Sequence, residues 1–168
     1  MTDNENTALY GFRKYGDTVL RAAYACTGSM EEAEDITQDV FLKLHSSGTE
    51  FADDEHMKAW LLRAAINRGR NYRKSFRFSR TSSIEVTNGS EMSYDFVYKD
   101  DGIREQVAAL PQKYSEVIFL YYYEGYNIRE ISELIGKGSN TVNSLLRRGR
   151  AKLRMELEKE DNYGAERV

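Results

Sequence analysis

Residues 127–154, NIREISELIGKGSNTVNSLLRRGRAKLR, decide the fold of the C-terminal half of the chain. Apolar residues recur at helical spacing on both sides of a break, which predicts two short helices. Gly136 and Gly138 supply the break, because glycine tolerates the positive φ that a tight turn needs. The two apolar faces consist of Ile128, Ile131, Leu134 and Ile135, then Val142, Leu145, Leu146 and Leu153. The stretch is predicted to be a helix-turn-helix.

The second predicted helix carries a polar and basic face opposite its apolar one. That face consists of Thr141, Asn143, Ser144, Arg147, Arg148 and Arg150. Residues 134–154 contain six basic and no acidic side chains. A basic helix after a tight turn is the arrangement with which helix-turn-helix proteins read the major groove of DNA. The alternative is a basic, solvated helix that only packs on its neighbour.

The formal net charge of −3 is an average over segregated blocks. Residues 56–84 hold eight basic and no acidic side chains, and residues 134–154 form the second such block. Residues 1–55, by contrast, hold twelve acidic and four basic side chains. Two separate basic blocks predict two places that meet phosphates. The acidic remainder would repel a polyanion, which argues against nonspecific coating of nucleic acid.

The composition limits the class of protein. A chain of 168 residues with one proline and long helical apolar patterns is predicted to be all-α, with one ordinary domain or two small ones. No window approaches the roughly 18–20 apolar residues of a membrane span, and the polar N-terminus is not a signal peptide. Cys26 stands alone and is expected in the core, and His45 and His56 lack metal-ligand spacing. A cytoplasmic protein without metal or cofactor is predicted.

Three helices are predicted in the N-terminal half. In order, they span residues 8–27, 30–45 and 56–74. The apolar face of the first consists of Leu9, Phe12, Val19, Leu20, Ala23 and Tyr24. Ser29 is placed to cap the second helix, with Glu32 at the capping-box position. Phe51 lies in the loop at residues 46–55, where it either plugs the core or stacks on an unpaired base.

The third predicted helix combines Trp60 with a run of cations and amides. Its polar stripe consists of Lys58, Arg63, Asn67, Arg70, Asn71 and Lys74. Aromatic residues interleaved with arginines are the composition that grips single-stranded DNA by stacking and charge. Trp60 by itself is more often a core residue, whereas the acid-free basic run favours a nucleic-acid surface.

The pattern changes after the third helix. Residues 75–101 are rich in Ser, Thr, Asn and Asp and show no helical period, which predicts a flexible linker. The predicted architecture is therefore two small helical domains, at residues 1–75 and 103–168, joined by a linker at 76–102.

Helical patterns return in the second domain. A short helix is expected around Val107, and a second, over residues 111–124, begins at Pro111 and ends at Gly125. The inward residues of that helix are Val117, Ile118, Leu120 and Tyr121. The acidic tail after Met155 is predicted to fray.

Three motifs together carry a family resemblance. They are AEDITQDVFLKLH at residues 33–45, WLLRAAINRGRNYRK at 60–74 and LPQKYSEVIFLYYYEGYNIREISELIGKGSNTVNSLLRRGRAKLR at 110–154. Their order and spacing closely resemble those of bacterial extracytoplasmic-function sigma factors, small members of the sigma-70 family. The resemblance covers nearly the whole chain and implies a sigma domain 2 followed by a sigma domain 4.

The resemblance implies roles for residues of the first domain. The segment that docks on the β′ clamp helices of RNA polymerase is matched by Asp35, Gln38, Asp39, Phe41 and Leu42. The part that melts the −10 element and captures a flipped base is matched by Phe51, Lys58, Trp60, Arg63, Asn67, Arg70 and Lys74. The physics agrees, because base capture needs a pocket, stacking surfaces and cations for the displaced strand.

The resemblance also implies roles in the second domain. The residues matching base-facing positions for the −35 element are Asn143, Ser144, Arg147 and Arg148. The expected phosphate contacts are Lys137, Thr141, Arg150 and Lys152. The chain departs from the family pattern at Lys137, where an apolar residue is usual, at Ser132, where alanine is common, and at Asn71 and Lys74. Lys137 is therefore either a phosphate contact or a surface substitution.

The implied function is promoter-specific initiation by a non-enzymatic sigma factor. Its expected partners are core RNA polymerase (the β′ clamp helices and the β subunit), double-stranded promoter DNA, the melted non-template strand and an anti-sigma factor, without membrane insertion. One alternative is a dimeric helix-turn-helix regulator that binds an operator; it would need a dimer seam and a palindromic site. Another is a protein that binds only other proteins, and the two basic blocks argue against this alternative.

Overall fold

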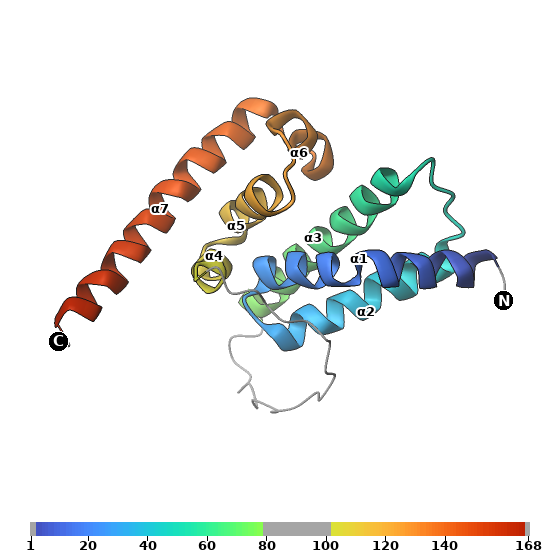
Figure 1. Ribbon diagram of the computed structural model, residues 1–168, viewed down its shortest axis with the longest axis horizontal. Helices are drawn as coiled ribbons and strands as arrows, with labels where there is room; N and C mark the ends of the chain where they lie inside the picture. The colour runs from blue at the N-terminus through green and yellow to red at the C-terminus, as the bar shows by residue number, and fades with distance from the viewer. Residues whose placement is uncertain (1–2, 79–101, 167–168) are drawn as a thin grey trace. The chain divides into compact units, whose positions relative to one another are not determined.

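The computed structural model describes residues 3–78 and 102–166, and every regular element in these ranges is a helix (Figure 1). The prediction of an all-α chain is confirmed. The chain divides into two compact units, Met1–Lys99 and Asp100–Val168, called unit 1 and unit 2 below. Most of the predicted linker falls at 79–101, outside the described residues, and the predicted domain bounds stay a prediction. No helix within the described ranges combines the length and the apolarity needed to cross a bilayer.

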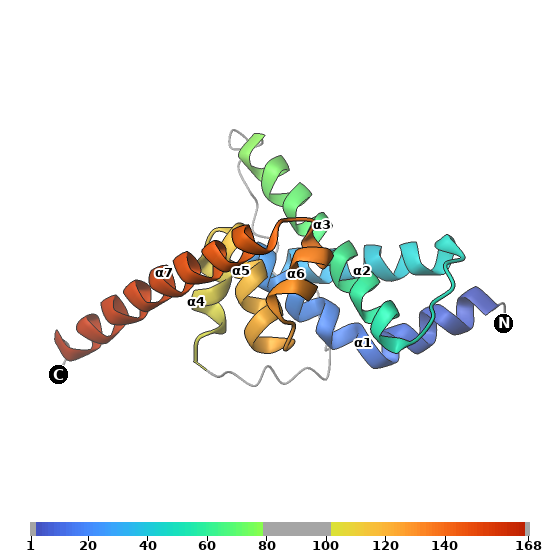
Figure 2. The same cartoon turned by 90° about the horizontal axis from the view of Figure 1, so that it is seen from above.

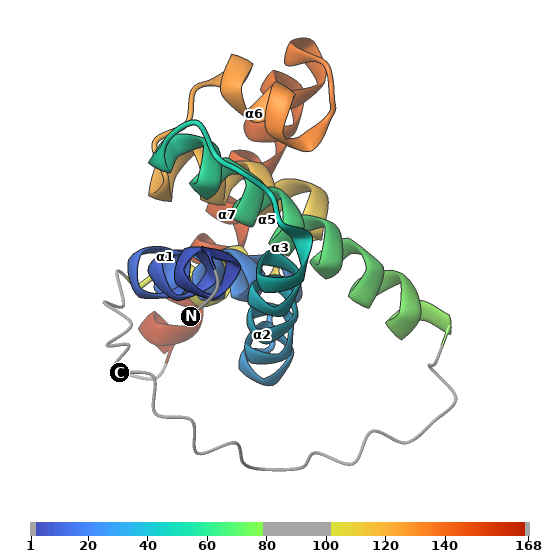
Figure 3. The same ribbon diagram turned by 90° about the vertical axis from the view of Figure 1, so that its right-hand side faces the viewer.

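Unit 1 consists of α1 (Asp3–Thr27), α2 (Met30–Ser47) and α3 (Asp54–Phe78), with α1 packed against the other two (Figure 3). All three are longer than predicted, and α1 gains its extra residues at its N-terminus. Gly28 and Gly48 have positive φ values of 69° and 63° and end α1 and α2. The Ser29 hydroxyl accepts a bond from the Glu32 amide at 3.3 Å, as predicted for the cap of α2.

The core of unit 1 is formed by side chains from all three helices. They include Val19, Leu20, Ala23 and Cys26 of α1, Val40 and Leu44 of α2, and Leu61, Leu62 and Ile66 of α3. Leu9 and Phe12, which were assigned to the apolar face of this helix, are 36% and 44% exposed. The buried line of α1 runs through Gly11, Tyr15 and Val19, and glycine contributes nothing to an apolar pattern. Phe12 therefore lies at the edge of that face.

Unit 2 begins with α4 (Arg104–Ala109) and α5 (Gln112–Ile118). Pro111 precedes α5 as its N-cap and is not its first helical residue. The predicted helix over residues 111–124 continues as a π-helical turn, η1 (Phe119–Tyr123), before Gly125 with φ 72°. A π turn adds a residue per turn and rotates the side chains that follow it. Tyr121, predicted to face inward, is consequently 37% exposed, whereas Leu120 is buried.

The helix-turn-helix consists of α6 (Ile128–Ile135) and the start of α7 (Ser139–Glu166), which meet at the turn (Figure 2). The predicted fraying after Met155 is wrong, because α7 continues to Glu166. Residues 151–160 are mostly strong helix formers, including Ala, Lys, Leu, Arg, Met and Glu. A 2.9 Å hydrogen bond from the Gln106 amide to the Glu160 carboxylate also ties α7 to α4.

The core of unit 2 fixes α7 closely against α5. Its buried members include Val117, Ile118 and Leu120, with Ile131, Leu134, Val142, Leu145 and Leu146 from the helix-turn-helix. Gly149 packs directly against α5: a Cβ there would lie 2.9 Å from Ile118 Cδ1 and 3.2 Å from Tyr114 Cβ. A side chain at this position would require Ile118 and Tyr114 to shift.

Candidate nucleic-acid and polymerase interfaces

The helix-turn-helix is confirmed, and its first helix is fixed by a reciprocal cap. The Asn127 side chain accepts from the Glu130 amide at 2.8 Å, and the Glu130 carboxylate accepts from the Asn127 amide at 2.9 Å. Gly136, with φ 70°, ends α6. The sequence offered this capping box through its Asn-x-x-Glu spacing, but it was not predicted.

The start of α7 presents the predicted base-facing residues away from the core. Asn143, Arg147 and Arg148 are exposed and Ser144 is half-buried. The intervening Val142, Leu145 and Leu146 are buried, so the helix has one apolar and one polar side. This part of α7 has the geometry of a recognition helix, and contact of these residues with bases stays a prediction.

The four predicted phosphate contacts lie in different surroundings. Thr141 is exposed. Arg150 donates to the Tyr122 hydroxyl at 2.9 Å, and the Lys152 ammonium lies 5.7 Å from the centre of the Tyr114 ring. Aromatic groups from η1 and α5 thus hold these two exposed cations.

Two lysines of unit 2 differ from the sequence expectation. Lys113, which was not singled out, lies 5.0 Å from the Tyr114 ring centre, beside the same ring as Lys152. Lys137 is half-buried, and its ammonium lies 3.9 Å from a carboxylate oxygen of the buried Glu116. The contact between Lys137 and Glu116 leaves no local signal, because it joins the turn to α5 across 21 residues.

The segment of α2 predicted to meet polymerase forms a single stripe. Asp35, Gln38, Asp39 and Leu42 follow i, i+3, i+4, i+7 spacing and are all exposed, Leu42 at 65%. Phe41 is only 9% exposed and packs edge to face on Phe12, with ring centres 5.2 Å apart. Four of the five residues therefore face outward and Phe41 lies beneath them.

An ion pair links this stripe to the basic helix. Arg68 of α3 donates to the Asp39 carboxylate at 3.3 Å. Arg68 was not singled out from the sequence, where it is one of several cations in the same run.

Aromatic residues gather where the loop between α2 and α3 meets α3. The half-buried Phe51 lies edge to face with His56 and with Trp60, at ring-centre distances of 5.3 and 5.9 Å. The Lys43 ammonium lies 5.9 Å from the centre of the Trp60 ring. His56 was not expected in this cluster. The Phe51 ring is half-buried, so part of it packs in this cluster and part stays accessible, and stacking on an unpaired base stays a prediction.

The predicted stripe along α3 is only partly brought together. Trp60, Arg63, Asn67 and Arg70 follow helical spacing from the aromatic cluster, with Arg63 and Asn67 exposed and Arg70 half-buried. Lys58 lies on a different face of the helix by the same spacing. The side chain of Lys74 falls outside the described residues.

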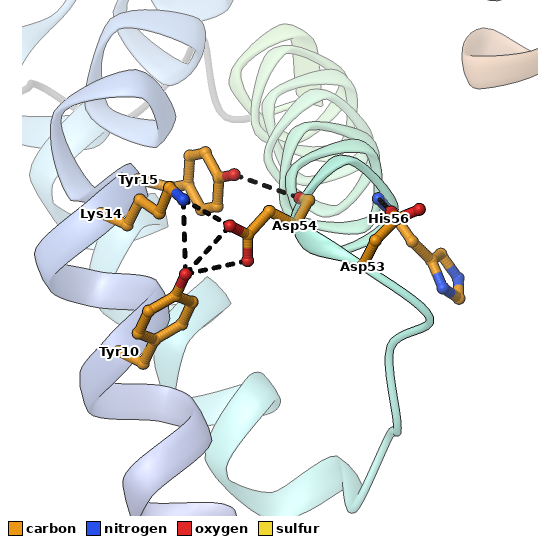
Figure 4. Close-up of polar contacts among 6 residues, drawn as sticks. All are labelled: Tyr10, Lys14, Tyr15, Asp53, Asp54 and His56. Carbon is orange, nitrogen blue, oxygen red and sulfur yellow. Dashed lines mark hydrogen bonds and ion pairs between the residues drawn. The ribbon is translucent and has the colours of Figure 1, made fainter.

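The start of α3 is held to α1 by a polar cluster, here called the Asp54 clamp (Tyr10, Lys14 and Asp54; Figure 4). The Tyr10 hydroxyl lies 2.9 and 3.0 Å from the two Asp54 carboxylate oxygens, and the Lys14 ammonium donates to the same carboxylate. The hydrogen bond from Lys14, followed by that from Tyr10, holds the pKa of Asp54 below its ordinary value. The same bond raises the pKa of Lys14.

Neighbouring bonds fix the end of the loop itself. The Tyr15 hydroxyl donates to the Asp54 carbonyl at 3.2 Å (Figure 4). The Asp53 carboxylate accepts from the His56 amide at 2.8 Å and caps α3, while His56 Nδ1 accepts from the Ala52 amide at 3.1 Å. The residues around Phe51 are therefore held by side chains of both α1 and α3.

Comparison with known proteins gives each unit a family match. The sigma-70 region 2 family matches residues 12–77, and the sigma-70 region 4 family matches residues 101–153. These ranges contain the α2 stripe, the aromatic cluster and the helix-turn-helix.

Curated relatives match across both units. The RNA polymerase sigma factor SigV of Bacillus subtilis is 31% identical, over 84% of this chain and 85% of the relative. The ECF RNA polymerase sigma factor SigW of the same organism is 28% identical, over 85% and 84%. Among solved structures, the sigma factor RpoE of Bartonella quintana, in complex with the anti-sigma factor NepR, matches with a TM-score of 0.65 and 21% identity over 89% of this chain and 95% of that one.

The structural match shows a shared fold, and the sequence matches show the family. Both sigma-70 regions occur in order, each over one unit, and a relative above 30% identity is covered over most of its length. The chain belongs to the extracytoplasmic-function sigma factors of the sigma-70 family.

Proposed function

We propose that the chain is a dissociable initiation subunit of RNA polymerase, in which unit 1 docks on the core enzyme and opens the −10 element and unit 2 reads the −35 element. It performs no catalysis of its own and acts in the cytoplasm, with polymerase. Base capture and backbone contacts supply the free energy of melting, without nucleotide hydrolysis.

The observation that carries this proposal is the two-sided start of α7. Val142, Leu145 and Leu146 anchor it in the core, while Arg147 and Arg148 point away from that core. An arginine can donate two hydrogen bonds to O6 and N7 of one guanine, and asparagine can pair similarly with adenine. Asn143 and Arg147 are four residues apart and share a face, so they suit neighbouring base pairs in one groove.

In unit 1 the aromatic cluster supports capture of an unpaired base. Phe51 and Trp60 offer partly exposed ring surface, and base–aromatic stacking contributes about 1–3 kcal/mol per base. Arg63 and Asn67 continue the stripe with a cation and an amide for the displaced strand. The stacking residues and the charges thus lie in the order that a strand running along α3 would meet them.

The exposed stripe of α2 supports docking on polymerase. Asp35 and Asp39 supply charge and Leu42 supplies an apolar contact that is 65% exposed. Phe41 acts from below, by fixing the helix against Phe12. We also propose an anti-sigma partner, because the structural relative RpoE is held by such a protein.

Run-off transcription tests the proposed function. Core RNA polymerase from the host is given genomic promoter fragments with and without the chain. We expect salt-sensitive, promoter-specific transcripts only when the chain is present, and weak promoter binding by the chain alone. A stable dimer that binds DNA tightly without polymerase, and yields no transcripts with it, would favour an operator-binding regulator instead.

A further inference from the structure

Lys137 lies in the turn of the helix-turn-helix, two residues before α7 begins. Its backbone is tied to α6 at both ends. The Lys137 amide donates to the Ser132 carbonyl at 3.2 Å, and the Ser132 hydroxyl donates to the Lys137 carbonyl. A single residue of α6 therefore holds the peptide units on both sides of the Lys137 Cα.

The side chain of Lys137 is directed to a third helix. Its ammonium lies 3.9 Å from a carboxylate oxygen of Glu116 on α5, and the Lys137 side chain as a whole is 34% exposed. Glu116 is only 1% exposed and also lies within reach of the Gln112 amide, at 3.4 Å. The Lys137 ammonium therefore places a cation beside a buried acidic side chain, and pairing lowers the cost of burying a charge.

The turn thus joins three helices through one residue. Lys137 is bound to α6 by its backbone and to α5 by its side chain, and the recognition helix continues from it after Gly138. Glycine on both sides gives the chain little stiffness of its own, so these contacts add to the buried packing of α7 in setting the direction in which it leaves the turn. The ammonium is engaged inside unit 2 and is not presented as a free surface cation.

We propose that Lys137, Glu116 and Ser132 position the recognition helix, and that Lys137 acts through Glu116 and not on a DNA phosphate. The inference rests on the proposed −35 reading by α7. It replaces the phosphate role expected for Lys137 with a specificity role: a tilted recognition helix still meets phosphates but aligns less well with base edges.

Opposite changes of charge separate the two roles. Lys137→Met removes a cation and Glu116→Gln removes an anion, so a phosphate contact predicts that the first weakens DNA binding and the second does not. If the two residues position the recognition helix as a pair, Lys137→Met and Glu116→Gln should both weaken the preference for the −35 element. We expect each variant to lower the preference for an intact over a scrambled −35 element roughly three- to tenfold, as for coupled neighbours. The double variant should lose no more than either single one, and Lys137→Arg should retain most of the preference.

The salt dependence supplies the control. Loss of one phosphate contact reduces the slope of log affinity against log salt by about one. Holoenzyme with Lys137→Met should keep the wild-type slope, whereas Lys152→Met, which alters an exposed cation of α7, should reduce it. A reduced slope with unchanged −35 preference in Lys137→Met would overturn the proposal.

A measurement without polymerase keeps this test separate from the proposed function. In a thermal-unfolding cycle of the full chain, Glu116→Gln and Lys137→Met should each lower the melting temperature of unit 2 and should not be additive. Additive or absent shifts would overturn the positioning pair. If no promoter is transcribed with the wild-type chain, the proposed function fails, while the unfolding cycle still decides whether the pair is coupled.

Discussion

In unit 2 the recognition helix rests on buried side chains, whereas in unit 1 the start of α3 is held by an exposed polar cluster. Leu146 of α7 is 1% exposed, while the Lys14 and Asp54 side chains of the clamp are each 44% exposed. Buried packing contributes a large free energy that salt does not screen. Exposed ion pairs contribute little, and salt and acid weaken them.

This difference in support suits the different proposed roles of the two surfaces in binding DNA. A helix that reads base edges must keep one angle, and the core of unit 2 supplies that constraint through Gly149 and Leu146. The loop that carries Phe51 has fewer buried supports and depends on hydrogen bonds from Asp53, Asp54 and their partners. We therefore expect unit 2 to respond to core mutations and the loop of unit 1 to respond to pH and salt.

The largest effect is expected from Leu146→Ala. It would leave a cavity beneath the recognition helix and lower the free energy of unfolding of unit 2 by about 2–5 kcal/mol. Leu42→Ala is the matched control, because Leu42 is 65% exposed and its loss should change stability by less than about 0.5 kcal/mol. Urea unfolding of both variants measures the contrast; equal losses would contradict the assignment of core and surface.

A smaller effect, on specificity alone, is expected from Arg147→Ala. Loss of a base-reading arginine should cost about 1–3 kcal/mol of discrimination between an intact and a mutated −35 element. Because Arg147 is exposed, the unfolding temperature should stay unchanged. Competitive transcription from the two promoters measures the discrimination, and a uniform loss on both would show that Arg147 contacts phosphate.

Two glycines compare the packing of the units directly. At Gly149 an added Cβ meets Tyr114 Cβ at 3.2 Å and Ile118 at 2.9 Å, so Gly149→Ala should destabilise unit 2 by about 1 kcal/mol despite the higher helix propensity of alanine. At Gly16 the Cβ would meet only Phe12, at 3.6 Å. Gly16→Ala should therefore stabilise α1 by about 0.5–1 kcal/mol. Thermal unfolding measures whether each variant melts above or below the wild type. If Gly149→Ala also melts above the wild type, α5 and α7 are less tightly packed than described.

The smallest effect is expected at the Asp54 clamp. The pKa of Asp54 is depressed in the folded chain, so the clamp stabilises unit 1 above the ordinary aspartate pKa and loses this contribution as pH falls below about 4. Asp54→Asn should melt slightly below the wild type at pH 7, and the difference should shrink as pH falls below the ordinary aspartate pKa and in high salt. Asp17→Asn, at an exposed position of α1, is the control. A difference that changes with neither pH nor salt would mean that the carboxylate charge is not what holds α3.

Much of the fold follows from local patterns. The apolar stripes of the helix-turn-helix, through Ile131, Val142 and Leu146, predicted both helices and their buried faces, and Gly136 predicted the turn. The acid-free block at residues 134–154 contains the exposed Arg147, Arg148 and Arg150, whereas among the described cations of the block at 56–84 only Arg63 is exposed; that these blocks meet phosphates stays a prediction. Helix ends were less predictable, since α1 starts earlier and α7 ends later than their apolar periods.

The missed features arise from contacts between distant positions. Tyr10 and Asp54 are 44 residues apart in the sequence, and Lys137 and Glu116 are 21 residues apart. The helical period of the sequence therefore predicts neither pair. The π turn at Phe119–Tyr123 was missed for a different reason. The π turn is defined by a backbone hydrogen bond from the Glu124 amide to the Phe119 carbonyl at 3.2 Å, which the apolar pattern of the sequence does not reveal.

The central claim is tested most directly by transcription with core polymerase from two promoters that differ only in the −35 element, using the wild-type chain and Arg147→Ala. We expect no specific transcript without the chain, a strong preference of the wild type for the intact element, and a much weaker preference of the variant, with α7 still folded. Equal transcription of both promoters by the wild-type chain, or none from either, would contradict the role of α7 as the −35 reader.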